Sequence, residues 1–277
     1  MSHYSLQTLM NHLSRFEKTP QTMPVLFIGH GNPMNAVTQN DFTRNWQAIG
    51  QALPKPKAIL SISAHWITPG KTQVLTTAKP ETIHDFYGFP PVLFEQQYPS
   101  DGAPALAEQT QQLAPDTVSL TDDWGLDHGT WSVLLSMFPK AEVPVYQLSI
   151  DYRKPPAFHY ELAARLKDLR ERGVLVMASG NVVHNLSQVQ WQEKPAFDWA
   201  LEFNERVKAA VSDRDDATLI DFKGFGTLGK QAHPTYDHYL PLLYSLGLRN
   251  AQDEVYFFND VIDMSSVSML SFVYLPN

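Results

Sequence analysis

The chain has 277 residues, a formal net charge of −8 and no cysteine, with 43% hydrophobic and 18% charged residues. This composition is typical of a folded globular protein and excludes a disordered one. The lack of cysteine excludes disulfides, thiolate nucleophiles and cysteine-ligated metal sites, which leaves His, Asp and Glu as metal ligands. The negative charge and the lack of a basic tract provide no field that would attract nucleic acid.

No apolar run is long enough to span a membrane, and the first residues lack the basic and apolar regions of a secretory signal. We therefore expect a cytoplasmic protein, monomeric or a small homo-oligomer, without nucleic-acid or membrane partners. No repeat, low-complexity segment or linker divides the chain. These features predict one catalytic domain over residues 1–277, with residues 1–22 as an N-terminal helical extension.

The first part of the chain alternates between helical and strand patterns. Apolar residues at helical spacing predict a helix over residues 5–17, and the apolar run Val25–Ile28 predicts a buried strand. A helix is expected over 41–53 and a second buried strand over 58–64. This strand–helix–strand order favours parallel strands joined by a right-handed crossover.

The alternation continues to the C-terminus and predicts a single α/β domain, with a central, mostly parallel sheet and helices on both faces. Two late strands, 255–258 and 267–274, are expected to be antiparallel and near an edge, after an apolar helix that follows His238. The remaining strands are expected at 73–77, 118–120, 143–150 and 174–178, and the remaining helices at 103–113, 131–137, 156–172 and 196–210.

Three histidines follow strand-like runs closely. His30 lies between two glycines directly after the first strand, His65 follows the second, and His184 follows the strand at 174–178. Ligands of open α/β sheets bind beyond the carboxyl ends of the strands. Neutral imidazole binds iron, zinc or copper, and three protein ligands leave coordination positions open. The three histidines together predict a metal or catalytic site at the strand ends.

Other features of the sequence carry less chemistry. His3, His12 and His159 lie in helical or terminal contexts and are expected to be solvated or packed surface residues. Residues 224–229 fit the pattern G-x-G-x-x-G but do not lie in a first strand–helix–strand unit, so we interpret them as a flexible loop. No nucleophile-elbow, Walker or H-E-x-x-H motif is present.

Six ordered motifs from Met23 onward resemble the LigB-type (class III) extradiol dioxygenases, and within them the branch that acts on DOPA. The motifs are Gly29–Asn35, Ser63–Trp66, Thr82–Phe86, Asp127–Trp131, Ala178–Leu186 and His233–Leu242.

The resemblance implies a role for five histidines. His30 and His65 match the two metal-ligand histidines, and His238 stands where protocatechuate-type relatives carry a glutamate ligand. His184 matches an active-site histidine that acts on the substrate hydroxyl or on oxygen and contacts the metal in a resting site. His128 matches a further active-site histidine that lines the substrate pocket, so His184 and His128 are the expected catalytic residues.

The resemblance also implies one divalent metal ion per chain, Fe(II) for catalysis with Zn(II) as a second candidate for the resting ion. The expected reaction opens the ring of a catechol, such as L-DOPA by 4,5-cleavage, with O₂. The residues alone also permit a zinc-dependent hydrolase or a non-catalytic metal-binding module on the same fold. The aromatic residues that either line the pocket or simply pack in the core and loops are Trp66, Phe86, Tyr87 and Trp131.

Overall fold

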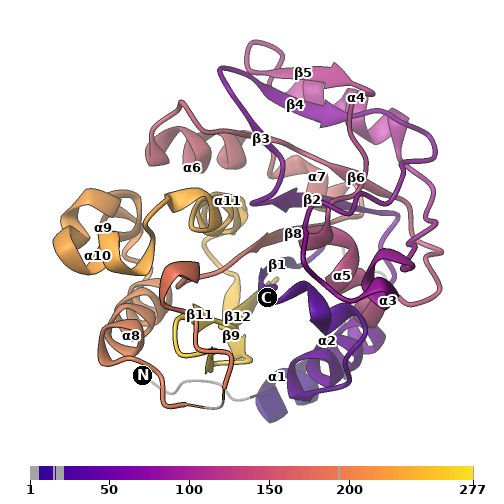
Figure 1. Cartoon of the computed structure of the whole chain (residues 1–277). Helices are drawn as coiled ribbons and strands as arrows, with labels where there is room; N and C mark the ends of the chain where they lie inside the picture. Colours follow the sequence, from indigo (N-terminus) through magenta and orange to yellow (C-terminus); the bar gives the residue numbers. More distant parts are fainter. Residues whose placement is uncertain (1–5, 15, 17–21, 193, 277) are drawn as a thin grey trace.

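A six-stranded mixed sheet forms the centre of the molecule in a computed structural model that describes residues 6–14, 16, 22–192 and 194–276 (Figure 1). Its strands are β1 (Val25–Gly29), β2 (Ala58–Ser63), β6 (Val145–Gln147), β8 (Val174–Gly180), β9 (Glu254–Phe258) and β12 (Ser271–Leu275). The order across the sheet is β6-β2-β8-β1-β12-β9. The pairings among β6, β2, β8 and β1 are parallel, whereas β12 pairs antiparallel with both β1 and β9. The expected mostly parallel sheet with antiparallel late strands is confirmed.

Side chains that alternate along each strand build two hydrophobic layers, one on each face of the sheet. In β1, Val25 and Phe27 belong to one layer, and Leu26 and Ile28 belong to the other. Helices cover both faces, as predicted. The first layer includes residues of α6 (Pro156–Arg165), α8 (Asp198–Asp213) and α11 (Leu240–Leu248), and the second includes residues of α1 (Leu6–Leu13), α2 (Asp41–Ala52) and α5 (His128–Met137).

The predicted strand at 73–77 lies outside the central sheet. β4 (Thr72–Leu75) pairs in parallel with β5 (Val118–Thr121) in a separate two-stranded sheet, which Figure 1 shows at the top beside α4 (Pro104–Leu113). The other short elements are β3 (Ile67–Thr68), β7 (Ile150–Asp151), β10 (Ile262–Asp263), β11 (Val267–Ser268), α3 (Pro91–Phe94), α7 (Asp168–Glu171), α9 (Asp216–Ile220) and α10 (Gly226–Ala232).

Three predicted elements are each divided in two. The strand at 143–150 leaves the central sheet after Gln147, and β7 then pairs with β3. The helix at 156–172 is interrupted between α6 and α7. The strand at 267–274 is divided near Met269 into β11, which pairs with β10, and β12, which pairs with β1 and β9.

Residues 224–229 are helical, so the prediction of a flexible loop is wrong. A 3₁₀ turn, Phe222–Phe225, is followed directly by α10. The Asp221 side chain accepts a hydrogen bond from the Gly224 backbone N–H, and buried Phe225 packs against Phe203 of α8. This local cap and this tertiary packing order the segment despite its glycines.

At the N-terminus, α1 accounts for residues 6–13 of the helix predicted over 5–17. His3 and most of the remainder of the predicted extension lie outside the described residues. Within the described part of the chain, no helix has both the length and the apolar character that a membrane crossing requires.

Candidate metal centre

The carboxyl ends of three adjacent parallel strands bring the first histidines together. β8 lies between β2 and β1, with Ser179 paired to Ser63 and Gly180 paired to Gly29. His30 follows β1 directly, and His65 follows two residues after the end of β2. Consequently, the two imidazoles extend over the end of β8 from either side, and their Nε2 atoms are 3.2 Å apart.

His238 and His128 reach the same place from other elements. His238 ends a 3₁₀ turn, Tyr236–His238, and its carbonyl accepts the backbone N–H of Asn181, just beyond β8. His128 is the first residue of α5, and the Asp127 side chain caps that helix by accepting from the Thr130 backbone N–H. The sequence placed His128 in a loop before the helix because the glycine and threonine that follow it are weak helix formers.

Three of the four histidines expected to contact the metal, His30, His65 and His238, each have their Nδ1 atom held by a neighbour. Nδ1 of His30 lies 3.0 Å from the Ser179 hydroxyl, which itself donates to the Gly129 carbonyl and therefore accepts from the imidazole. Nδ1 of His65 lies 3.2 Å from Asp85 Oδ2, and Nδ1 of His238 lies 2.5 Å from Asp237 Oδ2. Carboxylates accept only, so these contacts place the proton on Nδ1 and leave Nε2 bare.

The bare Nε2 atoms of His30, His65 and His238 face one another. One ligand atom from each of these residues lies within 4.8 Å of the others, and Nε2 of His238 is buried without a hydrogen-bond partner. Two imidazole nitrogens that bind one zinc ion at 2.0–2.1 Å in tetrahedral geometry are about 3.3 Å apart. The 3.2 Å contact between His30 and His65 therefore brings two lone pairs to a spacing that suits a shared cation.

Burial keeps this cluster neutral. Removal from water, followed by repulsion between neighbouring imidazoles, lowers the pKa of His30, His65 and His238 well below its ordinary value. At neutral pH the three rings therefore carry lone pairs, and a cation does not have to displace protons from them.

His184 is adjacent to the three-histidine group but belongs to a different set of ligand atoms. Its ring stacks on the ring of His238, with ring centroids 3.5 Å apart and an interplanar angle of 6°. One of its ring nitrogens lies within 4.8 Å of ligand atoms of Asp237 and His238. Burial lowers the pKa of His184 to about 4. The structure thus provides a neutral imidazole next to His238.

His128 lies on the opposite side of the cluster, against His65. The two ring centroids are 3.8 Å apart, and Asp85 Oδ2 lies 2.9 Å from His128 Nδ1. Asp85 Oδ1 also accepts the His128 backbone N–H at 2.8 Å. Phe86 makes a T-shaped contact with the His128 imidazole, with ring centroids 5.5 Å apart, and so provides an apolar surface beside it.

A buried polar network supports the base of α5. Asp127 is fully buried, and its Oδ2 accepts from the Gln147 side-chain amide at 2.7 Å. Burial and the nearby Asp85 carboxylate raise the pKa of Asp127 to about 6. A Cβ atom at Gly129 would lie 2.9 Å from the His65 ring, so glycine allows helix and ligand to approach closely.

The four aromatic residues considered for the pocket wall have different environments. Trp131 is fully buried in the second hydrophobic layer and donates from Nε1 to the Ile83 carbonyl, whereas Tyr87 is 93% exposed. Trp66 stacks on Trp124, and Phe86 contacts His128. Of these four, Phe86 is the one whose ring packs on a site histidine.

The sequence interpretation did not identify the residues that orient the imidazoles. Asp85 and Asp237 stand beside histidines in the motifs His84–Asp85 and Asp237–His238, and this adjacency was the available signal. Ser179 had no such signal, because its partner His30 is 149 residues away.

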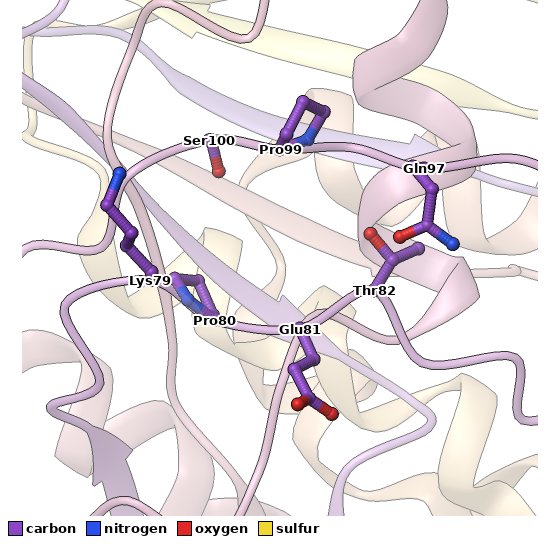
Figure 2. A pocket seen from close by; sticks show the side chains of 7 residues that line it. All are labelled: Lys79, Pro80, Glu81, Thr82, Gln97, Pro99 and Ser100. Atoms are coloured by element: carbon purple, nitrogen blue, oxygen red, sulfur yellow. The ribbon is translucent and has the colours of Figure 1, made fainter.

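A separate surface pocket of about 430 Å³ contains none of these histidines (Figure 2). Its lining mixes polar and apolar surface in about equal parts and includes Lys79, which pairs with Asp101. The candidate chemistry therefore belongs to the histidine cluster. The residues that line the pocket are Lys79, Pro80, Glu81, Thr82, Gln97, Pro99 and Ser100.

Comparison with known proteins identifies the family. Residues 22–271 match the model of the catalytic LigB subunit of aromatic ring-opening dioxygenase. The chain belongs to the LigB family. A 4,5-DOPA dioxygenase extradiol of Escherichia coli K12 is 47% identical over 258 residues, which cover 90% of this chain and 93% of the relative. A protein of the same name from Beta vulgaris is 33% identical and covers 80% of this chain and 85% of its own length.

A solved structure agrees with the fold. The crystal structure of an uncharacterized protein from Escherichia coli K12 matches with a TM-score of 0.79 and 42% sequence identity, over 91% of this chain and 99% of that one. The expected class of this chain, a metal-dependent extradiol ring-opening dioxygenase, is confirmed. The donor atoms described above fit such a metal.

Proposed function

We propose that this LigB dioxygenase binds one divalent metal ion through Nε2 of His30, His65 and His238 and opens the ring of a catechol such as L-DOPA by 4,5-cleavage with O₂. The convergence of three bare Nε2 atoms, from buried His30 and His238 and partly buried His65, supports the metal site most directly. The substrate assignment rests on the names of the relatives from E. coli and Beta vulgaris. Three nitrogen ligands leave coordination positions open for small molecules.

A bound ion, Fe(II) for catalysis or Zn(II) at rest, supplies a positive charge for the catechol oxygens, and iron adds the redox chemistry that joins the substrate with O₂. The protein supplies the proton transfers. His184 is neutral at pH 7, because burial lowers its pKa to about 4, so its lone pair accepts a hydroxyl proton from the bound catechol. His128 donates its Nδ1–H group to Asp85 and presents its Nε2 atom to the substrate.

A catechol panel with an oxygen electrode tests this proposal. Anaerobically purified protein loaded with Fe(II) should consume O₂ with L-DOPA and form a yellow ring-opened product. Zinc-loaded protein serves as the control for an oxygen-independent hydrolase. If the iron-loaded protein neither takes up O₂ nor alters any catechol, the proposed reaction is wrong.

The metal ligands require a separate measurement. Replacing His238 with alanine removes one of three nitrogen ligands, so the metal content of the purified protein should fall from about one ion per chain to well below half, as a lost ligand weakens the site strongly. Elemental analysis of the variant and the wild type gives the answer. A His238→Ala protein that keeps its full metal content would exclude His238 as a ligand.

A further inference from the structure

One carboxylate links two histidines of different expected roles. Asp85 Oδ2 lies 3.2 Å from Nδ1 of His65 and 2.9 Å from Nδ1 of His128. A carboxylate oxygen has two lone pairs, so it accepts both N–H groups at once. The other carboxylate oxygen, Oδ1, accepts the His128 backbone N–H at 2.8 Å. Both oxygens of Asp85 are thus used within this small group.

The two residues before Asp85 in the loop are anchored by hydrogen bonds to other segments. The Ile83 backbone N–H donates to the Leu126 carbonyl at 2.7 Å, and the Ile83 carbonyl accepts from Trp131 Nε1 at 2.8 Å. The His84 imidazole lies 3.0 Å from the Gln96 carbonyl. These contacts anchor the two residues before Asp85, so the carboxylate is held in place before any substrate arrives.

We propose that Asp85 is a positioning residue that clamps His65 and His128 together through their Nδ1–H groups. This inference rests on the proposed function, in which His65 binds metal and His128 acts on substrate. The clamp fixes the tautomer of both rings and turns both Nε2 atoms toward the site. It also stabilises two imidazoles whose centroids are only 3.8 Å apart. Loss of Asp85 therefore weakens metal binding and turnover together.

The first test measures the tautomers in metal-free wild-type protein. Nitrogen-15 spectra of histidine-labelled protein should show a proton on Nδ1 and a bare Nε2 for both His65 and His128. The signals are assigned by their disappearance in His65→Gln and His128→Gln variants. Detection of His128 with its proton on Nε2 would overturn the clamp, and this result does not depend on activity or on any Asp85 variant.

The second test replaces the carboxylate by its amide. In Asp85→Asn we expect a 10- to 100-fold weaker Zn²⁺ affinity by competition with a chromophoric chelator, and a 10- to 100-fold lower kcat with saturating metal. KM for L-DOPA should change less than about threefold, because Asp85 contacts imidazoles. Asp123→Asn changes the charge equally at an exposed position and should match the wild type in all three quantities.

A shortened side chain provides the third test. Asp85→Ala leaves room for a small anion. Millimolar formate should raise the kcat of this variant at least tenfold, whereas chloride should leave it unchanged. Wild-type Zn²⁺ affinity and kcat in Asp85→Asn would contradict the clamp. Inactive wild-type protein with both Nδ1–H tautomers present would instead contradict the proposed reaction alone, so the two failures are distinguishable.

Discussion

At the scale of single residues, the site depends on which ring nitrogen carries the proton. His30, His65 and His238 each use Nδ1 for a hydrogen bond within the protein, and this leaves three lone pairs directed at one point. The positions of His30 and His65 were predictable, because each follows a buried strand, whereas His238 was expected only from the family resemblance. The partners that select the tautomer were not predictable, because Ser179 is far from His30 in the sequence and contacts it only through strand pairing.

His184 provides a prediction about catalysis. Its ring stacks on His238, but its ligand atoms lie outside the group formed by His30, His65 and His238. In His184→Ala we expect metal content to be retained and kcat to fall by about 10²–10⁴, the usual contribution of a general acid–base residue. Elemental analysis and oxygen uptake measure the two quantities. Loss of the metal together with activity would show that His184 is a ligand instead.

His159 provides a prediction about pH and stability. It was expected at the surface, but it is fully buried with Nδ1 3.0 Å from the Tyr244 hydroxyl, and burial lowers its pKa to about 4. As the pH falls, His159 becomes protonated near pH 6.5 in the unfolded chain but only near pH 4 in the folded protein. Stability is therefore present above pH 6.5 and is lost as the pH falls through this window.

The size of this effect is measurable. From these two pKa values, His159 should cost about 2 kcal/mol of stability between pH 7 and pH 5. Urea unfolding of metal-free wild type and His159→Gln at both pH values gives the comparison, since other histidines contribute equally to both proteins. If His159→Gln loses as much stability between pH 7 and pH 5 as the wild type, the pH dependence does not come from His159.

At the scale of elements, the sequence predicted where strands and helices begin better than where they are interrupted. Apolar periodicity identified β1, β2 and β8, which carry the site. It missed the break between β11 and β12, where β11 pairs with nearby β10, and the exit from β6, where β7 pairs with β3 far along the chain. It also missed that α5 begins at His128, where the cap is the buried Asp127 side chain.

The start of α5 yields a prediction at this scale. In Gly129→Ala the new Cβ would lie 2.5 Å from the Ser63 hydroxyl and 2.9 Å from the His65 ring, so His65 must shift. We expect a destabilisation of about 1–3 kcal/mol, as for other overpacked sites, together with weaker Zn²⁺ binding. Gly88→Ala is the control, because Gly88 has a φ of 77° but no atom within 4 Å of the added Cβ. It should lose about 1 kcal/mol of stability and keep its Zn²⁺ affinity. Equal Zn²⁺ affinity in both variants would contradict this view of the helix.

At the scale of the whole molecule, a buried ion pair connects segments from both ends of the chain. Arg170 of α7 is fully buried and pairs with Asp253 at 2.7 Å. It also donates to the carbonyls of Met23, just before β1, and Leu248, at the end of α11. One guanidinium thus joins the segments that enter β1 and β9.

Removal of this cation should destabilise the fold. Arg170→Met removes the cation that pairs with the buried Asp253 carboxylate and the donor to two carbonyls, which should cost about 3–5 kcal/mol. Urea unfolding measures the loss. The exposed pair Arg44–Asp41 is the control, and Arg44→Ala should change the free energy of unfolding by less than about 1 kcal/mol. Similar losses in the free energy of unfolding for the two variants would show that the buried pair stabilises the fold no more than the exposed pair.

The three proposed ligand nitrogens come from positions 30, 65 and 238. A growing polypeptide on the ribosome offers only two of these donors until its last segments are synthesised. We therefore expect late metallation, with an occupant that reflects which ions are free at that time. An all-imidazole donor set favours copper and zinc over ferrous iron by the Irving–Williams order. Recombinant preparations from iron-poor growth media should accordingly carry zinc, and their turnover should follow the supply of iron during expression.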